Sequence, residues 1–275
     1  MRFFFTGVLI TISVSCAHAQ FYYKDFISSS MASADQISYK NAAVRTIKLN
    51  SFEANGFPSE NFFCEKRISK NYKKSTLYTR IGLTGKQMLE NTFNDQGLLM
   101  GTYDSSEFSV THTFFEYNDK GLLTATRTQS RSNDDDFLSE MTEVHEYHYD
   151  GNEQLTDMVR IKNNSDSSII SFSIDENKHV ALEKDTRTGM IYYYYYNDNG
   201  KMTDITHFND SKNKMIADYI YEYNADGTIH QLTTTEAGAD NFVVWKYKYG
   251  NGLRIAERLF DRDGVLIGKI EYEYK

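Results

Sequence analysis

Apolar and aromatic residues alternate with polar ones along most of the chain, and the alternation is clearest from Ile191 to Ile205. Tyrosines continue up to Tyr196, a polar turn follows, and alternation resumes at Met202. A period of two is typical of a β-strand, and Asn first with Gly fourth suits a type I turn whose last residue is left-handed. We therefore predict a β-hairpin in which Tyr196 lies opposite Met202, Tyr195 opposite Thr203, Tyr194 opposite Asp204 and Tyr193 opposite Ile205.

The same turn recurs along the chain. An aromatic residue stands four positions before a glycine, and in every copy except the first, at Gly56, an aliphatic residue stands two positions after it. The predicted turn glycines are Gly56, Gly97, Gly121, Gly200, Gly227 and Gly264, while Glu153 and Lys178 occupy the glycine position in two degenerate copies. Most spacings fit a unit of about 25 residues with two strands and two turns, and such units stack on their neighbours. The sequence thus predicts an all-β fold of antiparallel hairpin repeats, forming an elongated twisted sheet, a β-spiral or an open barrel.

Four segments follow from this pattern. Residues 1–19 read as a signal peptide, with one basic residue, an apolar run and the small-x-small motif Ala17-His18-Ala19. We expect cleavage after Ala19, and the alternative is a lipoprotein attached at Cys16. Residues 20–43 are predicted as a leader or short helix, residues 44–92 as N-terminal β-hairpins and residues 93–275 as the repeat region. No segment is apolar enough for a transmembrane span.

Composition narrows the possible partners. The 275 residues carry a formal net charge of -8, which argues against nucleic acid. The basic concentration from Lys66 to Lys74 is interpreted as a solvated face among nearby acids. Removal of the signal peptide leaves Cys64 as the sole cysteine, so no internal disulfide is expected and Cys64 is read as a small buried side chain. Aromatic residues make up 15% of the chain and must supply much of the core.

The string Tyr-x-Tyr-Asn/Asp-x-x-Gly-x-Leu/Ile/Met resembles the YD repeat of the RHS family, over roughly Phe93 to Lys275. The resemblance implies hairpins wound into a β-spiral and export from a bacterial cell. The arginine that usually follows the family's glycine is replaced by Leu122, Lys201 and Thr228. Family members that enclose a toxin are far longer, and this chain shows no self-cleaving core or toxin tail. Gly189 to Met202 also looks similar to cell-wall choline-binding repeats, and Trp245 to Gly252 to MORN-like antitoxin repeats, although both space aromatic and glycine differently.

Residue types that carry out catalysis or bind metals are present, but their spacing defines no site. His145 and His148 are an odd number of strand positions apart, so they should face opposite sides of the sheet. Asp134, Asp135 and Asp136 could bind calcium, but consecutive residues converge poorly and a solvated loop is favoured. Neither a Gly-x-Ser-x-Gly elbow nor a glycine-rich phosphate loop occurs. We predict no enzyme activity, no metal and no cofactor.

The extra rings of the central hairpin, Tyr193 and Tyr195, are the speculative ligand-binding residues. Exposed aromatic rings on a rigid sheet suit a sugar ring or an apolar patch of a partner. The alternative is that a neighbouring turn of the spiral covers them. We predict an exported, non-catalytic repeat β protein that acts as a scaffold or binding module for a polysaccharide or protein at the cell envelope, in the periplasm, on the cell surface or secreted. The alternative function is an accessory component of a toxin or secretion system, as the resemblance to YD repeats implies.

Overall fold

The computed structural model describes residues 21–82, 85–133, 139–235 and 241–275. This part of the chain contains one helix and a single sheet of eighteen strands. Their bounds are α1 (Lys24–Asn41), β1 (Thr46–Glu53), β2 (Phe63–Ile68), β3 (Lys74–Ile81), β4 (Gly85–Phe93), β5 (Leu99–Ser105), β6 (Ser109–Tyr117), β7 (Leu123–Ser132), β8 (Glu140–Tyr149), β9 (Leu155–Lys162), β10 (Asp166–Ile174), β11 (Val180–Asp185), β12 (Ile191–Tyr196), β13 (Met202–Asn209), β14 (Lys214–Tyr223), β15 (Ile229–Thr235), β16 (Phe242–Gly250), β17 (Leu253–Phe260) and β18 (Leu266–Tyr274).

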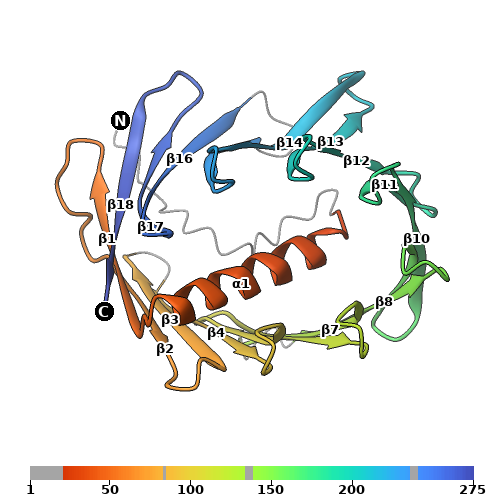
Figure 1. Cartoon of the computed structure of the whole chain (residues 1–275), viewed down its shortest axis with the longest axis horizontal. Coiled ribbons are helices and arrows are strands. Elements are labelled where there is room, and N and C mark those ends of the chain that lie inside the picture. The colour runs from red at the N-terminus through yellow and green to blue at the C-terminus, as the bar shows by residue number, and fades with distance from the viewer. Residues whose placement is uncertain (1–20, 83–84, 134–138, 236–240) are drawn as a thin grey trace.

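The sheet closes on itself as an antiparallel barrel. Each strand pairs with its neighbours in sequence, and β1 pairs with both β2 and β18, so Ile47 lies opposite Lys66 on one side and Tyr274 on the other. Figure 1 shows the resulting ring of strands. The predicted all-β, antiparallel fold is confirmed. Closure of the ring leaves neither β1 nor β18 as an edge strand, because each has a partner on both sides.

Most of the recurring turns share one hydrogen-bond pattern, which the loop after β6 illustrates, whereas the turns at Gly56 and Gly227 differ. The side-chain oxygen of Asn118 accepts from the backbone N–H groups of Lys120 and Leu122, both at 3.0 Å, and Gly121 N–H donates to the Asn118 carbonyl. Gly121 has φ of 78°, a left-handed conformation that costs glycine little. All six predicted turn glycines have positive φ, and so do Glu153 and Lys178 in the degenerate copies.

The register of the central hairpin agrees with the prediction at one pair and differs from it at three. Tyr196 does lie opposite Met202, but Tyr195 pairs with Asp204, Tyr194 with Ile205 and Tyr193 with Thr206. A bulge between Tyr195 and Tyr196 shifts the register by one residue, because Thr203 is left without a partner across the ladder. Ile205 therefore lies on the same face as Tyr194, and it does not share a face with Tyr193 and Tyr195 as predicted.

Helix α1 lies inside the ring, within the segment predicted as a leader or short helix (Figure 1). Its aromatic N-terminal end packs against the larger of two buried clusters, which includes Met158, Ile170 and Ile205 at 0% exposure. A second cluster, around Ile47 and Cys64, lies where β1, β2 and β18 meet. Tyr192 and Tyr194 point inward and are buried, so alternate side chains such as Tyr193 and Tyr195 lie on the outer wall of the barrel.

The most deeply buried side chains of α1 are polar, although apolar ones such as Phe26 also pack against the wall. Its buried residues are Ser29, Ser33 and Gln36. The Ser33 hydroxyl accepts from the Leu99 backbone N–H at 3.0 Å, and the Gln36 amide donates to the Tyr72 carbonyl at 2.7 Å. The helix is therefore positioned inside the ring by directional hydrogen bonds as well as by apolar packing.

Candidate functional site

The outer wall carries an open hollow of about 670 Å³, which we call the aromatic hollow. Tyr195 is 50% exposed and Tyr193 is half-buried, and both rings contribute to its lining. The lining also includes Ser173, Asp175, Asn177, His179, Ala181, Leu182, Tyr194, Tyr196, Asn197, Asp198 and Gly200. The structure thus places the two sequence-predicted site residues side by side on one strand and surrounds them with polar side chains from two adjacent turns.

The aromatic hollow lies where the wall has a short ladder. Only Leu182, Glu183 and Lys184 of β11 pair with β12, opposite Tyr193, Tyr192 and Ile191. Tyr194 to Tyr196 continue beyond this ladder, and the Tyr196 hydroxyl bridges back to the Val180 carbonyl at 2.9 Å. Because the two strands part here, side chains line a depression between them.

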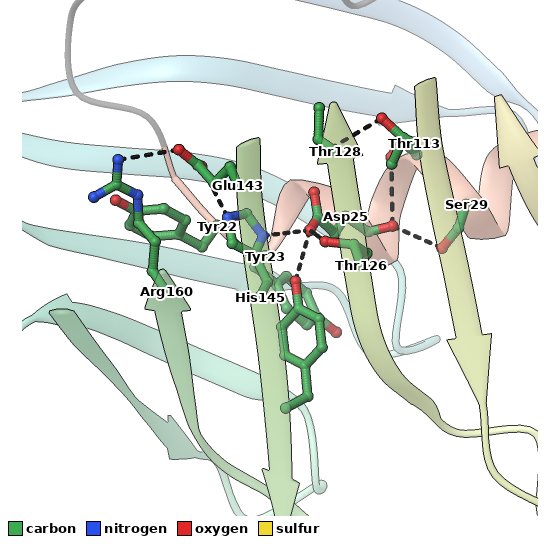
Figure 2. A network of polar contacts seen from close by, with 12 residues as sticks. Tyr22, Tyr23, Asp25, Ser29, Thr113, Thr126, Thr128, Glu143, His145 and Arg160 are labelled. Atoms are coloured by element: carbon green, nitrogen blue, oxygen red, sulfur yellow. Dashed lines mark hydrogen bonds and ion pairs between the residues drawn. The ribbon is translucent and has the colours of Figure 1, made fainter. Parts of the chain in front are cut away.

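A network of hydrogen bonds and ion pairs lies inside the barrel and joins α1 to the wall (Figure 2). Asp25, in the first turn of the helix, accepts three hydrogen bonds at the same oxygen, Oδ2. The donors are the Thr126 hydroxyl at 2.9 Å, His145 Nδ1 at 2.7 Å and the Tyr147 hydroxyl at 2.7 Å. The network continues from His145 Nε2 to Glu143 at 2.9 Å and from Glu143 to Arg160 at 3.0 Å.

The charge states of this network follow from its geometry. Burial alone lowers the pKa of an imidazole, but Asp25 and Glu143 outweigh it and raise the pKa of His145 to about 9. Burial acts to raise the pKa of both carboxylates, but His145 leads the opposing contacts and lowers each pKa to about 2. The imidazolium therefore donates from both nitrogens to two carboxylates. It has no nitrogen left to accept a proton, so it is not arranged as a general base.

Glu183, on β11, holds the chain just before the helix. Its carboxylate oxygens accept from the backbone N–H groups of Tyr22 and Tyr23, each at 2.8 Å. A negative charge near a helix N-terminus is favourable, and Tyr23 at the N-cap makes no side-chain cap of its own. Glu183 is 2% exposed, and burial raises its pKa to about 7.

His145 and His148 face opposite sides of the wall, and His148 pairs with Asp157 at 2.7 Å on the outside. Cys64 is buried. Among the described residues, no group of three or more His, Cys, Asp or Glu side chains is placed to hold a metal ion. The Asp134 to Asp136 loop, Cys16 and the predicted cleavage site after Ala19 lie outside the described residues.

Sequence reasoning missed the network around Asp25. A signal was present, since Asp25, Ser29, Ser33 and Gln36 follow one another at steps of four, four and three, which places them on one face of a helix. A polar stripe in a helical register indicates a helix that docks through hydrogen bonds. The Asp25 partners Thr126 and His145 are 101 and 120 residues away, so no local pattern could have identified them.

Comparison with known proteins gives structural likenesses only. No protein-family model matches the sequence, and no curated protein matches it. A porin-like protein from Bacteroides uniformis is similar with a TM-score of 0.38 and 10% identity, over 84% of this chain and 98% of that chain. A porin-like protein from Bacteroides vulgatus has a TM-score of 0.32 at 10% identity, over 84% of this chain and 98% of that one.

Toxin structures are also among the matches. The Tc holotoxin pore of Photorhabdus luminescens has a TM-score of 0.30 at 11% identity, over 86% of this chain and 17% of that chain. The structure of TcdB2-TccC3-Cdc42 has the same TM-score at 12% identity and the same coverage, 86% and 17%. These likenesses are accompanied by no family match in sequence. Among the described residues, no helix is both long enough and apolar enough to cross a membrane.

Proposed function

We propose that this protein is an exported, non-catalytic binding barrel of the cell envelope and that its aromatic hollow binds a glycan. The observation that carries the proposal is the half-exposed ring of Tyr195 beside Tyr193, in a hollow bordered by polar side chains. An exposed ring offers a flat apolar face to the C–H groups of a sugar. Asp175, Asn177 and Asp198 supply acceptors and donors for its hydroxyl groups.

Two further observations favour a binding role over catalysis. The buried histidine of the internal network already donates to two carboxylates, and the Cys64 thiol is 1% exposed with its pKa raised by burial to about 12. Neither group has the access and the activated state that a nucleophile or base needs. The network contacts α1 itself, so its role is to position the helix.

Export is supported by the N-terminal signal pattern in the sequence and agrees with the outer wall. That wall carries charged pairs between neighbouring strands, such as Lys74 with Glu90 at 2.6 Å and Arg127 with Glu116 at 2.6 Å. Charged side chains of this kind are hydrated, so the wall is suited to an aqueous compartment, which is compatible with the proposed export.

The proposal is tested by polysaccharide binding. Retention by a panel of neutral and acidic polysaccharides in affinity gels identifies the ligand, and Tyr195→Ala should weaken its binding roughly tenfold, since one aromatic contact contributes on the order of 1 kcal/mol beyond its area. Phe114→Ala is the matched control, because Phe114 is 48% exposed and does not line the aromatic hollow. No retained polysaccharide, or unchanged binding by Tyr195→Ala, would rule the glycan site out. A protein captured through Tyr195 would favour the toxin or secretion accessory role instead.

A further inference from the structure

Opposite charges face each other over part of the outer wall. Arg131 lies opposite Glu140 across β7 and β8, and Lys74 and Arg127 each have an acidic partner on an adjacent strand. Opposite charges across a ladder are stabilising, and like charges directly opposite are destabilising. A pair of like charges directly opposite each other therefore destabilises the sheet, which indicates a role other than stability.

Such pairs occur at two places on the outer wall. Arg80 on β3 is directly opposite Lys86 on β4. Across β16, β17 and β18, Arg258 is directly opposite both Lys246 and Lys269. Within the described residues no ion pair joins Arg80, Lys86 or Arg258 to an acid. Uncompensated cations are unexpected in a chain with a net charge of -8.

The first place is hollowed. A depression of about 430 Å³ is lined by Phe63, Arg67, Tyr78, Arg80 and Lys86, among others, and we call it the basic hollow. Phe63 is 37% exposed and Tyr78 is 36% exposed. The Arg67 guanidinium bonds Glu65 at 2.7 Å and lies 5.4 Å from the Tyr78 ring centroid. The basic hollow therefore combines exposed rings with two cations that lack acidic partners.

The second place forms a ladder of cations, the basic row of Lys246, Arg258 and Lys269, in which Lys269 also pairs with Glu271 at 2.7 Å. Lys246 lies 5.3 Å from the Phe260 ring centroid, and Lys269 lies 4.7 Å from that of Phe52 on β1. Since β1 is hydrogen-bonded to both β18 and β2, the row and the basic hollow are separated by a single strand. Adjacent strands are about 4.8 Å apart, so the row presents positive charges at regular short intervals.

We propose that the basic hollow and the basic row form one binding surface for an acidic polysaccharide whose sugars carry carboxylates. Regularly spaced cations match a polymer with a carboxylate on each repeating sugar, and the exposed rings of Phe63 and Tyr78 match its apolar faces. Arg80 and Arg258 are suited to bidentate contacts with carboxylates. This surface lies on other strands than the aromatic hollow, so the inference does not depend on the glycan proposed there.

The net negative charge of the protein argues against duplex nucleic acid as the ligand of this surface. Duplex DNA carries about one negative charge per 1.7 Å, and a chain with an overall negative charge repels it outside any local patch. A polyuronate has a lower charge density, and each sugar also offers a face for stacking. The surface therefore fits the polysaccharide better.

The test measures binding of polygalacturonate to the full-length mature protein by affinity gel electrophoresis. Wild-type protein should be retarded at low salt and progressively released as salt rises. The double variant Arg80→Gln with Arg258→Gln should bind at least tenfold more weakly. The control replaces Lys40 and Lys70, two exposed lysines outside the surface, with Gln, which changes the net charge equally and should leave retardation within twofold.

Three outcomes overturn the proposal: absence of retardation by polygalacturonate, equal retardation of the double variant and wild type, and stronger binding of dextran sulfate or duplex DNA than of polygalacturonate. Neutral dextran should not retard the protein through this surface. Tyr195→Ala should bind polygalacturonate as tightly as the wild type does. The double variant should bind the polysaccharide ligand of the aromatic hollow as tightly as the wild type does. These two variants therefore show separately whether the basic surface and the aromatic hollow each bind a polysaccharide.

Discussion

Asp25 of α1 and His145 of β8 meet at 2.7 Å inside the barrel, although 120 residues separate them in the chain. The contact is between Oδ2 and Nδ1 of an ion pair that burial protects from solvent screening. It fixes the start of the helix against the wall.

Replacing Asp25 with Ala should lower the free energy of unfolding by about 3–5 kcal/mol, because the buried imidazolium loses a partner and two hydroxyl groups lose their acceptor. Urea denaturation followed by circular dichroism measures the change. Asp35→Ala is the control on the same helix, since Asp35 is exposed, and its effect should stay within about 0.5 kcal/mol. Equal effects of both substitutions would contradict the assigned role of the network.

Stability should be greatest at about pH 4.5 and should decline on either side of it. His145 has its pKa raised from 6.5 to about 9, so its contribution is complete below pH 6.5 and is lost as pH rises through 9. Glu183 has its pKa raised from 4.5 to about 7, so its protonation favours the folded state. The free energy of unfolding therefore falls as pH rises from 4.5 through 7. Asp25 and Glu143 have their pKa lowered to about 2, so their contributions are lost as pH falls from about 4 through 2.

Urea midpoints measured from pH 3 to 10 test this profile. Glu183→Gln should reduce the decline between pH 4.5 and 7, because a neutral amide no longer titrates there, while the decline toward pH 9 should persist. A wild-type midpoint that rises steadily from pH 6 to 9 would be incompatible with the protonation states described above.

Lys178→Gly should stabilise the barrel by about 1 kcal/mol. Lys178 has φ of 70° at the turn position that glycine fills in regular copies, and a left-handed residue with a Cβ costs roughly 1–2 kcal/mol. Lys178→Ala removes the same charge and side chain but keeps the Cβ, so it should bring no gain. The prediction is wrong if the two variants have equal melting temperatures.

Cys64 should not react with a thiol reagent in the folded protein. Its side chain is 1% exposed, and burial raises its pKa to about 12, so the thiolate is scarce at neutral pH. A chromogenic disulfide reagent should label it only in denaturant, at the rate of unfolding. Rapid stoichiometric labelling under native conditions would show that β2 opens.

Local features of the sequence predicted the turns well. The side-chain oxygen of Asn118 and the left-handed Gly121 act within five residues, so their geometry follows from short-range chemistry. The register of β12 with β13 was predicted correctly only at the turn. The bulge beside Tyr196 moved each further pair by one, because a bulge depends on packing across strands as well as on the loop.

Long-range features could not be read in the same way. The pairing of β1 with β18 joins Ile47 to Tyr274, and nothing in either strand alone specifies the other. Helix α1 gave a weak apolar pattern because its buried side uses Ser29, Ser33 and Gln36. Hydropathy marks apolar contacts, so it misses a helix whose docking relies on hydrogen bonds.

Closure of the ring has a consequence for how the protein folds. The seam between β1 and β18 unites segments more than two hundred residues apart, so the loop entropy of this pairing is large and the contact order of the fold is high. Until β18 pairs with β1, both strands present unpaired backbone groups that another copy of the chain could occupy. We therefore expect slow refolding whose yield falls as protein concentration rises.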